Sequence, residues 1–162
     1  MMKSLIEHLS GLPKEAIAFV ISALPIAELR GGIPVAASMG MGWQKALLVC
    51  ALGNFVPVVP ILLLLDPVAR VLRRWRPFDR FLTWVFERTR RRSALVERYE
   101  ALGLMLFVAV PLPMTGAWTG ALAAYLFRVR LVYAIPAIAA GILIAGVIVT
   151  LATQGVLQLW RL

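Results

Sequence analysis

The fold of this chain is decided by Leu24-Pro25-Ile26-Ala27-Glu28-Leu29-Arg30-Gly31-Gly32-Ile33-Pro34. An uncharged run from Ala16 to Ala27 leads into this stretch, and a second uncharged run, from Gly31 to Gln44, continues it. Ionisable groups are expensive to place in hydrocarbon, so they usually face a partner or a wet cavity. The acid and the base therefore mark either a buried polar site or a loop end that meets water.

Residues that break helices surround the charged pair. Proline lacks an N–H group and clashes with the preceding turn, and glycine is conformationally permissive. Pro25, Gly31, Gly32 and Pro34 therefore predict that the helix is interrupted around Glu28 and Arg30. A broken helix carrying ionisable residues is how many membrane transporters form a site near the bilayer midplane.

The composition predicts an all-α integral membrane protein. Of the 162 residues, 61% are hydrophobic, and the mean hydropathy is +0.86. Long uncharged blocks occupy 46–65, 101–127 and 131–160. Each reaches the roughly 20 residues that a helix needs to cross a bilayer core. We expect a single membrane domain over 1–162, and no secretory signal peptide is evident, since Lys14 and Glu15 interrupt the first apolar run.

A basic segment separates the two apolar halves. Ten of the fourteen arginines lie within 66–100, together with five acidic residues. Asp66-Pro67 is a favourable helix start, and apolar residues then recur at helical spacing with Arg70, Arg73 and Arg74 on the other face. The segment is therefore predicted to form amphipathic helices in the membrane interface, on the cytoplasmic side by the positive-inside rule.

The two halves share a layout, which indicates an internal duplication. Each has a broken apolar stretch, 14–42 or 101–127, followed by a long apolar span, 43–65 or 131–160, and an offset of 86 places Pro25 on Pro111. Half-helices of about 12 residues are too short to cross a bilayer alone. A crossing by 101–127 would leave Arg128 and Arg130 outside, against the charge bias. We therefore predict an inverted repeat of re-entrant helical hairpin plus transmembrane helix.

Several classes of function are disfavoured by the residues. One histidine and one cysteine, far apart, supply neither a metal cluster nor a Cys–His nucleophile pair, and Cys50 is interpreted as a buried packing residue. Phosphate-binding glycine loops are absent from the sequence. We accordingly expect no metal, no cofactor, no enzymatic activity and no nucleic-acid partner, despite a net charge of +9.

The segment Glu28-Leu29-Arg30-Gly31-Gly32-Ile33-Pro34, with the Pro/Gly-rich tip at 111–120, resembles the small multi-drug export protein family of prokaryotes. The layout of hairpins followed by spans is similar to the DedA/VTT superfamily. The resemblance implies proton-linked transport, or movement of phosphate-bearing lipid carriers between leaflets. The second tip lacks the arginine common in DedA proteins and has Thr115 and Trp118 instead.

Three functions follow as expectations. The first is a small proton-coupled transporter of the cell (inner) membrane, with a site between the two hairpin tips. The second is a flippase or scramblase for phosphate-bearing lipid, fed by Arg70, Arg73 and Arg74. The third is a membrane scaffold. Anionic lipids, protons, a small anionic or lipidic substrate and a second copy of the chain are the expected partners. The predicted site residues are Glu28, Arg30, Gly31, Gly32, Pro34, Asn54, Thr115 and Gly116.

Overall fold

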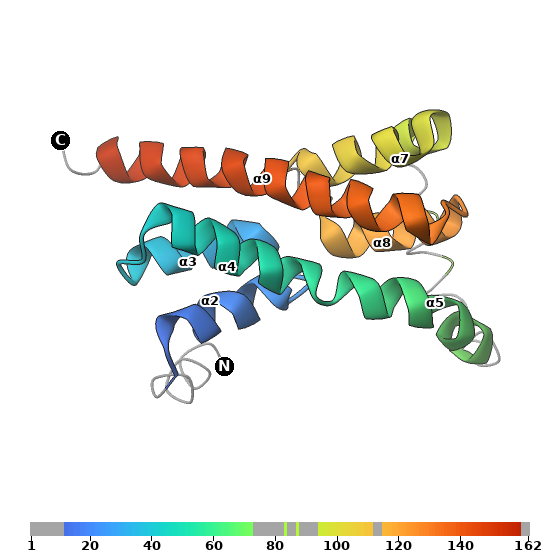
Figure 1. Ribbon diagram of the computed structural model, residues 1–162, viewed down its shortest axis with the longest axis horizontal. Helices are drawn as coiled ribbons and strands as arrows, with labels where there is room; N and C mark the ends of the chain where they lie inside the picture. The colour runs from blue at the N-terminus through green and yellow to red at the C-terminus, as the bar shows by residue number, and fades with distance from the viewer. Residues whose placement is uncertain (1–11, 73–82, 84–86, 88–93, 112–114, 160–162) are drawn as a thin grey trace. The chain divides into compact units, whose positions relative to one another are not determined.

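The computed structural model describes residues 12–72, 83, 87, 94–111 and 115–159. Within these residues the protein is helical and has no strand. The elements, shown in Figure 1, are α2 (Lys14–Ala23), α3 (Glu28–Ser38), α4 (Trp43–Phe55), α5 (Val58–Leu72), α7 (Ala94–Ala109), α8 (Ala117–Leu126) and α9 (Leu131–Leu159). The prediction of an all-α protein is confirmed for this part of the chain.

The chain divides into two compact units. The first comprises Met1–Asn54 with Gly146–Leu162, and the second comprises Phe55–Ala145. Each unit contains one helical hairpin, α2–α3 or α7–α8, and one part of α9. The predicted division into repeats at 1–65 and 101–162 is a different partition, because it assigns each long helix whole to one half.

In the first hairpin, α2 packs against α3 across a turn at 24–27. The turn is closed by a hydrogen bond from Glu28 N to Leu24 O of 3.0 Å. The helix break lies at Pro25, as predicted. The break predicted at Gly31, Gly32 and Pro34 is wrong, because α3 begins at Glu28 and continues through all three. Proline in a helix removes one hydrogen bond, here the one to the Arg30 carbonyl, and the remaining bonds carry the helix past it.

Both ends of the first hairpin lie at the same end of the unit. Lys14, the first residue of α2, donates a hydrogen bond to the carbonyl of Met39 at the end of α3. Next to it, Glu15 forms a salt bridge with Lys45 in the first turn of α4. The chain therefore returns to the level at which it entered, and α2 and α3 span only about 15 to 17 Å each at 1.5 Å per residue.

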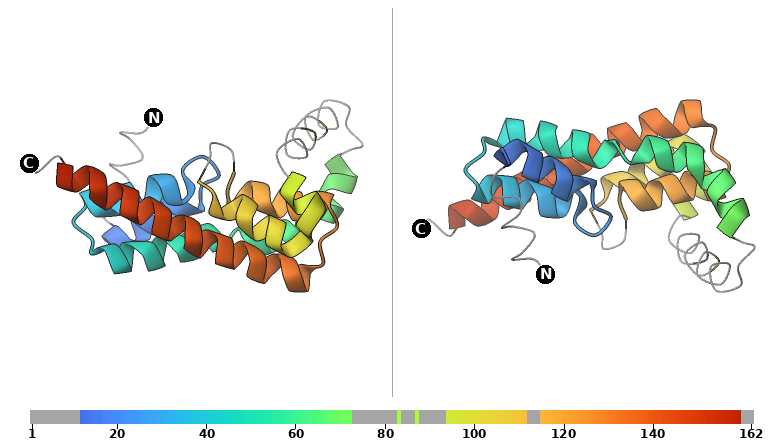
Figure 2. Two further views of the ribbon diagram at one scale, coloured as in Figure 1. Left: turned by 90° about the horizontal axis from the view of Figure 1, so that it is seen from above. Right: turned by 90° about the horizontal axis from the view of Figure 1, so that it is seen from below.

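In the second hairpin, α7 and α8 run side by side in opposite directions (Figures 1 and 2). The first helix starts at Ala94, seven residues before the predicted boundary of 101. The tip is held by Thr115 Oγ1, which donates to Val110 O at 2.7 Å. Gly116 then caps α8 and accepts a hydrogen bond from Gly120 N at 2.8 Å.

Two stretches among the described residues are long and apolar enough to cross a membrane, Trp43–Leu65 (23 residues) and Leu131–Val156 (26 residues). The first is interrupted by a turn at 56–57, where Pro57 lies. Pro60 lies in the first turn of α5, where proline is tolerated. The helix start predicted at Asp66-Pro67 is wrong, because α5 runs on to Leu72.

The same close contacts recur in the two units. A methyl group on Gly53 of α4 would lie 2.4 Å from Phe19 O of α2, and one on Gly141 of α9 would lie 2.7 Å from Met105 O of α7. In each unit, a glycine therefore brings the helix that follows the hairpin, α4 or α9, against the backbone of the hairpin's first helix, α2 or α7. The two glycines are 88 residues apart, and their two partners are 86 apart.

The contacts within the hairpins follow the same numbering. A methyl group on Gly32 of α3 would lie 1.8 Å from Ser22 Oγ, and one on Gly120 of α8 would lie 2.4 Å from Val108 Cγ2. The glycines are again 88 apart and their partners 86 apart. An offset of 86 thus relates the first hairpin helices, and 88 relates everything after the tip, so the second tip is two residues longer.

The ends of the hairpins also match. Gly40 N bonds Ala37 O and Met41 N bonds Ala36 O, with Gly40 at φ 74°. Arg128 N bonds Tyr125 O and Val129 N bonds Ala124 O, with Arg128 at φ 52°. Both pairs form the Schellman motif, in which a left-handed residue ends a helix. The offset is 88 here too, and the local structure therefore supports an internal duplication.

Candidate functional site

The first hairpin tip carries the two charged residues in a strained setting. Glu28 opens α3 with a φ of 47°, in the left-handed region that side-chain-bearing residues rarely adopt. Glu28 and Arg30 are both partly buried, and Leu29 between them is fully buried. The Glu28 carboxylate acts electrostatically on the Arg30 guanidinium. The tip thus presents an acid and a base at one helix start within an apolar hairpin.

Two further polar residues are buried in the same unit. Asn54 of α4 is 1% exposed, and its Oδ1 makes no hydrogen bond within the described residues. Ser22 of α2 is also buried; its hydroxyl faces the thiol of Cys50, a weak partner, and has no nitrogen or oxygen partner in the described part of the chain. Burying a polar group without a full partner costs free energy. The first unit therefore keeps polar atoms that its packing leaves incompletely bonded.

The second unit shows that the architecture does not require these polar groups. By the offsets of 86 and 88, the counterparts of Ser22, Glu28, Arg30 and Asn54 are Val108, Gly116, Trp118 and Ile142. Val108 and Ile142 are buried and fill the same positions with apolar side chains. The charged and amide groups of the first unit are therefore additions to a shared packing scheme, which favours a functional role for them.

Other predicted site residues have structural roles. Gly31 N donates a hydrogen bond to Ala27 O at 2.8 Å, so this N–H is engaged within the hairpin. Gly32 is buried where α3 approaches Ser22, and Pro34 is exposed. Thr115 and Gly116 hold the second tip together through the hydrogen bonds described above. Their participation in a shared site stays a prediction.

The predicted lipid-binding arginines fall largely outside the description. Arg73 and Arg74 lie outside the described residues, as does most of the predicted amphipathic segment. Arg70 lies within α5, whose side chains beyond Leu65 are not described. Anionic-lipid binding by these residues therefore stays a prediction.

Sequence reasoning missed Ser22, because a lone serine in an apolar run looks like any small packing residue. The only available signal is the comparison with the second repeat, where its counterpart is valine. Within the described residues, no cluster of histidine, cysteine or carboxylate groups is suited to a metal ion. The chemistry that the tip offers is proton exchange at a carboxylate and charge pairing at a guanidinium.

One known protein family matches most of the chain. The profile of the family described as "Putative small multi-drug export protein" matches residues 28–148. The chain belongs to this family. The match begins at Glu28 and extends through the second hairpin into α9. The family name is that of a small export protein, and with the long apolar helices it identifies a membrane protein. No curated protein and no solved structure matches the chain.

Proposed function

We propose that this protein is a small proton-coupled exporter in which Glu28 binds and releases the proton. Arg30 would act as the internal partner of the deprotonated carboxylate, or hold an anionic group of the substrate when Glu28 is protonated. The family name, the apolar spans and the acid–base pair support this proposal together. The buried Asn54 Oδ1 and Ser22 hydroxyl supply further polar contacts inside the same unit.

The observation that carries the proposal is the left-handed backbone of Glu28. A non-glycine residue in this conformation costs on the order of 1 kcal/mol or more. Glycine would relieve that cost, because it has no Cβ. A carboxylate kept in this conformation, next to a guanidinium at the tip of an apolar hairpin, supports a functional role for Glu28.

The test measures the folding and the transport of each variant separately. Glu28→Gly and Glu28→Gln should leave the thermal midpoint of the detergent-purified protein unchanged or raise it. Both should abolish uptake of a fluorescent cation, ethidium, and of a fluorescent anion, carboxyfluorescein, driven by a pH gradient in proteoliposomes. Gln44→Glu, which adds an exposed carboxylate outside the tip, is the control and should transport normally. Gradient-driven uptake by Glu28→Gln equal to the parent would reduce the carboxylate to a structural role.

A second variant tests the partner. Arg30→Lys keeps the positive charge but loses the planar guanidinium fork that grips a carboxylate or phosphate bidentately. Transport should fall by roughly 10-fold or more if the fork is needed, because a hydrogen bond to a charged group contributes about 1.5–3 kcal/mol. Lysine supporting the full rate would show that Arg30 contributes charge alone.

The proposed location is the inner membrane, with 66–100 in the cytoplasm. Single cysteines at Gln44 and Arg128, in a Cys50→Ser background, report the orientation of the two hairpin ends, since both native residues are exposed. The inverted arrangement predicts labelling by a membrane-impermeant maleimide from opposite sides of oriented vesicles. Labelling of both from one side would reject it.

Lipid translocation is the second candidate, favoured by the ten arginines within 66–100. Each basic residue near an anionic surface contributes roughly 1 kcal/mol of attraction. If the protein translocates lipid, neutralising Arg70, Arg73 and Arg74 should slow the flipping of fluorescent phosphatidylglycerol. If the protein is an exporter, the same changes should leave solute flux unchanged. Absence of both fluxes in the parent would favour the scaffold.

A homodimer is proposed from the first tip. Ile26 is 98% exposed, and Leu24 beside it is 43% exposed, so this irregular turn offers apolar surface. Irregular backbone is disfavoured against lipid and is usually covered by protein. A cysteine at Ile26 should then form a covalent dimer in membranes, and a purely monomeric product under oxidation would contradict the proposal.

A further inference from the structure

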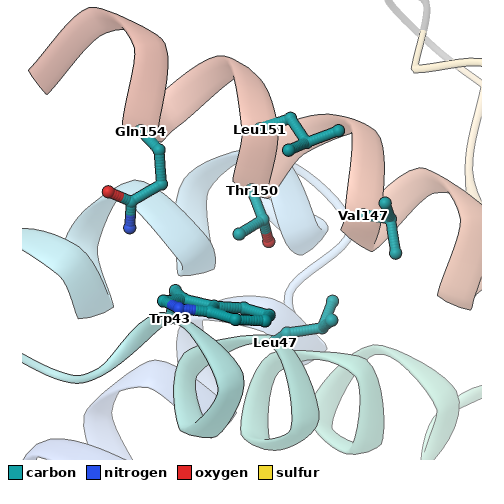
Figure 3. Close-up of a pocket in the computed structure, with 6 residues that line it drawn as sticks. All are labelled: Trp43, Leu47, Val147, Thr150, Leu151 and Gln154. Atoms are coloured by element: carbon teal, nitrogen blue, oxygen red, sulfur yellow. The ribbon is translucent and has the colours of Figure 1, made fainter. Parts of the chain in front are cut away.

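A pocket lies on the first unit, away from the hairpin turn. It is lined by Trp43 and Leu47 from the first two turns of α4, and by Val147, Thr150, Leu151 and Gln154 from α9, and it encloses about 330 Å³ (Figure 3). A volume of this size is at the lower end of small-molecule sites. None of the six lining residues is charged.

One polar group in this pocket is unpaired. Thr150 is 6% exposed, and its Oγ1 makes no hydrogen bond within the described residues. Figure 3 shows its side chain directed toward Trp43 and Leu47. The hydroxyl of a threonine in a helix can donate to the carbonyl one turn earlier. Thr153, three residues on, does so, donating to Val149 O at 2.8 Å.

The surroundings define the missing partner. The Trp43 ring and the aliphatic side chains offer a mostly apolar surface, and Figure 3 places the amide of Gln154 at one end of it. A buried hydroxyl left without a partner costs free energy, which a bound hydrogen-bonding group would recover. A hydrocarbon chain would fill the space and leave the hydroxyl unsatisfied.

We propose that this pocket binds a small, uncharged aromatic compound that carries one hydroxyl group. Its ring lies against Trp43, and its hydroxyl bonds Thr150 Oγ1. The site is distinct from the Glu28–Arg30 pair, but the two are connected through packing: a methyl group on Gly146 would meet Leu47 Cδ1 at 2.5 Å and Leu29 Cδ1 at 3.8 Å. Leu47 lines the pocket, and Leu29 separates Glu28 from Arg30.

The experiment uses Trp43 as its own reporter. In a full-length protein whose other four tryptophans are replaced by phenylalanine, 4-bromophenol should quench Trp43 fluorescence saturably, because bromine quenches on contact. Phenol should displace the bromophenol and restore the signal, and toluene at the same membrane concentration should restore far less. Quenching that rises linearly and is unaffected by phenol would show simple partitioning into the bilayer and overturn the proposal.

Substitution isolates the hydroxyl contact. Thr150→Val keeps the shape and should weaken 4-bromophenol binding by about 2- to 12-fold, the effect of one neutral hydrogen bond. Binding of 4-bromotoluene should not change. Thr153→Val is the matched control, since its hydroxyl is already bonded, and should bind as the parent does. Equal weakening in both variants, or none in Thr150→Val, would refute the contact.

A third experiment tests whether a lipid acyl chain occupies the pocket instead. If an acyl chain and phenol compete for the pocket, adding phenol should reduce the quenching of Trp43 by phospholipids that are brominated on the acyl chain. Strong quenching by these lipids that phenol leaves unchanged, with no saturable effect of 4-bromophenol, would mean that an acyl chain fills the groove. That result would overturn the proposal, and it would leave the role of Glu28 in proton coupling untouched.

Discussion

Replacing Gly53 by alanine tests the contact that ties α4 to the first hairpin. The new methyl group would lie 2.4 Å from Phe19 O and 3.0 Å from both Phe19 C and Phe19 Cα. A carbon and a carbonyl oxygen approach to about 3.3 Å at closest in ordinary contacts. All three atoms belong to the backbone, so no side-chain rotation relieves the clash, and α2 and α4 must separate by roughly 0.9 Å.

Two opposing effects set the magnitude. Overpacking of a tight interface costs about 1–3 kcal/mol. Alanine in place of glycine inside a helix returns roughly 0.5–1 kcal/mol. The net loss of stability therefore lies between about 0 and 2.5 kcal/mol, and the centre of this range, about 1.3 kcal/mol, corresponds to a midpoint lower by about 3–5 °C for a protein of this size.

The assay measures the temperature at which the protein, purified in one detergent, loses its monodispersity, and this temperature is taken as the midpoint. Gly155→Ala is the control, because a methyl group at Gly155 meets nothing within 4 Å. It should leave the midpoint unchanged or raise it slightly. The midpoint of Gly141→Ala, the counterpart in the second unit, should fall as the midpoint of Gly53→Ala does. A midpoint for Gly53→Ala equal to that of Gly155→Ala would refute the close approach of α2 and α4.

Three further predictions follow. Gly32→Ala should lower the midpoint because its methyl group meets Ser22 Oγ at 1.8 Å, and adding Ser22→Ala should restore part of the loss, since contacts of 3.1 Å with Ser22 Cβ and 3.2 Å with Cys50 Sγ remain; a double variant with no recovery would contradict the contact. Arg128→Gly should stabilise the protein by up to about 1.5 kcal/mol, because relief of the left-handed backbone returns about 1–2 kcal/mol and the greater freedom of glycine in the unfolded chain costs about 0.4–1 kcal/mol. Arg128→Ala should not stabilise it, as thermal midpoints will show. The hydrogen bond from Lys45 lowers the pKa of Glu15, so this pair should stabilise the protein near pH 6 and lose its effect as the pH falls below about 4. The midpoint difference between the parent and Glu15→Gln should vanish there, and a difference that persists would contradict the pairing.

Local chemistry explains which parts of the fold could be predicted from the sequence. The breaks at Pro25 and Pro57 follow from proline's own geometry, and the long helices follow from uncharged runs of sufficient length. The prediction failed at Gly31, Gly32 and Pro34, which α3 accommodates within one helix. Gly32 lies there because Ser22 needs the space, and this depends on a neighbour 10 residues away that no local rule identifies.

The candidate site likewise has some features that the sequence predicts and others that only the folded structure shows. Glu28 and Arg30 stand out in the sequence because charge is rare in apolar runs. The strained backbone of Glu28, the incompletely bonded groups of Ser22 and Asn54, and the pocket hydroxyl of Thr150 are properties of the folded structure. The single offset of 86 assumed tips of equal length, so it paired Glu28 with Met114 and missed that Gly116 is the counterpart of Glu28.

The joined ends of the first hairpin have a consequence for how the protein is made. Lys14 meets Met39, and Glu15 meets Lys45, so α2 and α3 complete their contacts at that end only when the start of α4 is present. A nascent chain that has just emerged as far as Ser38 lacks both this clasp and the surface around Gly53 that receives α2. We therefore expect a nascent chain truncated before α4 to leave the hairpin open to extraction by alkaline carbonate, and a chain that extends through Leu65, the end of the first apolar span, to resist extraction.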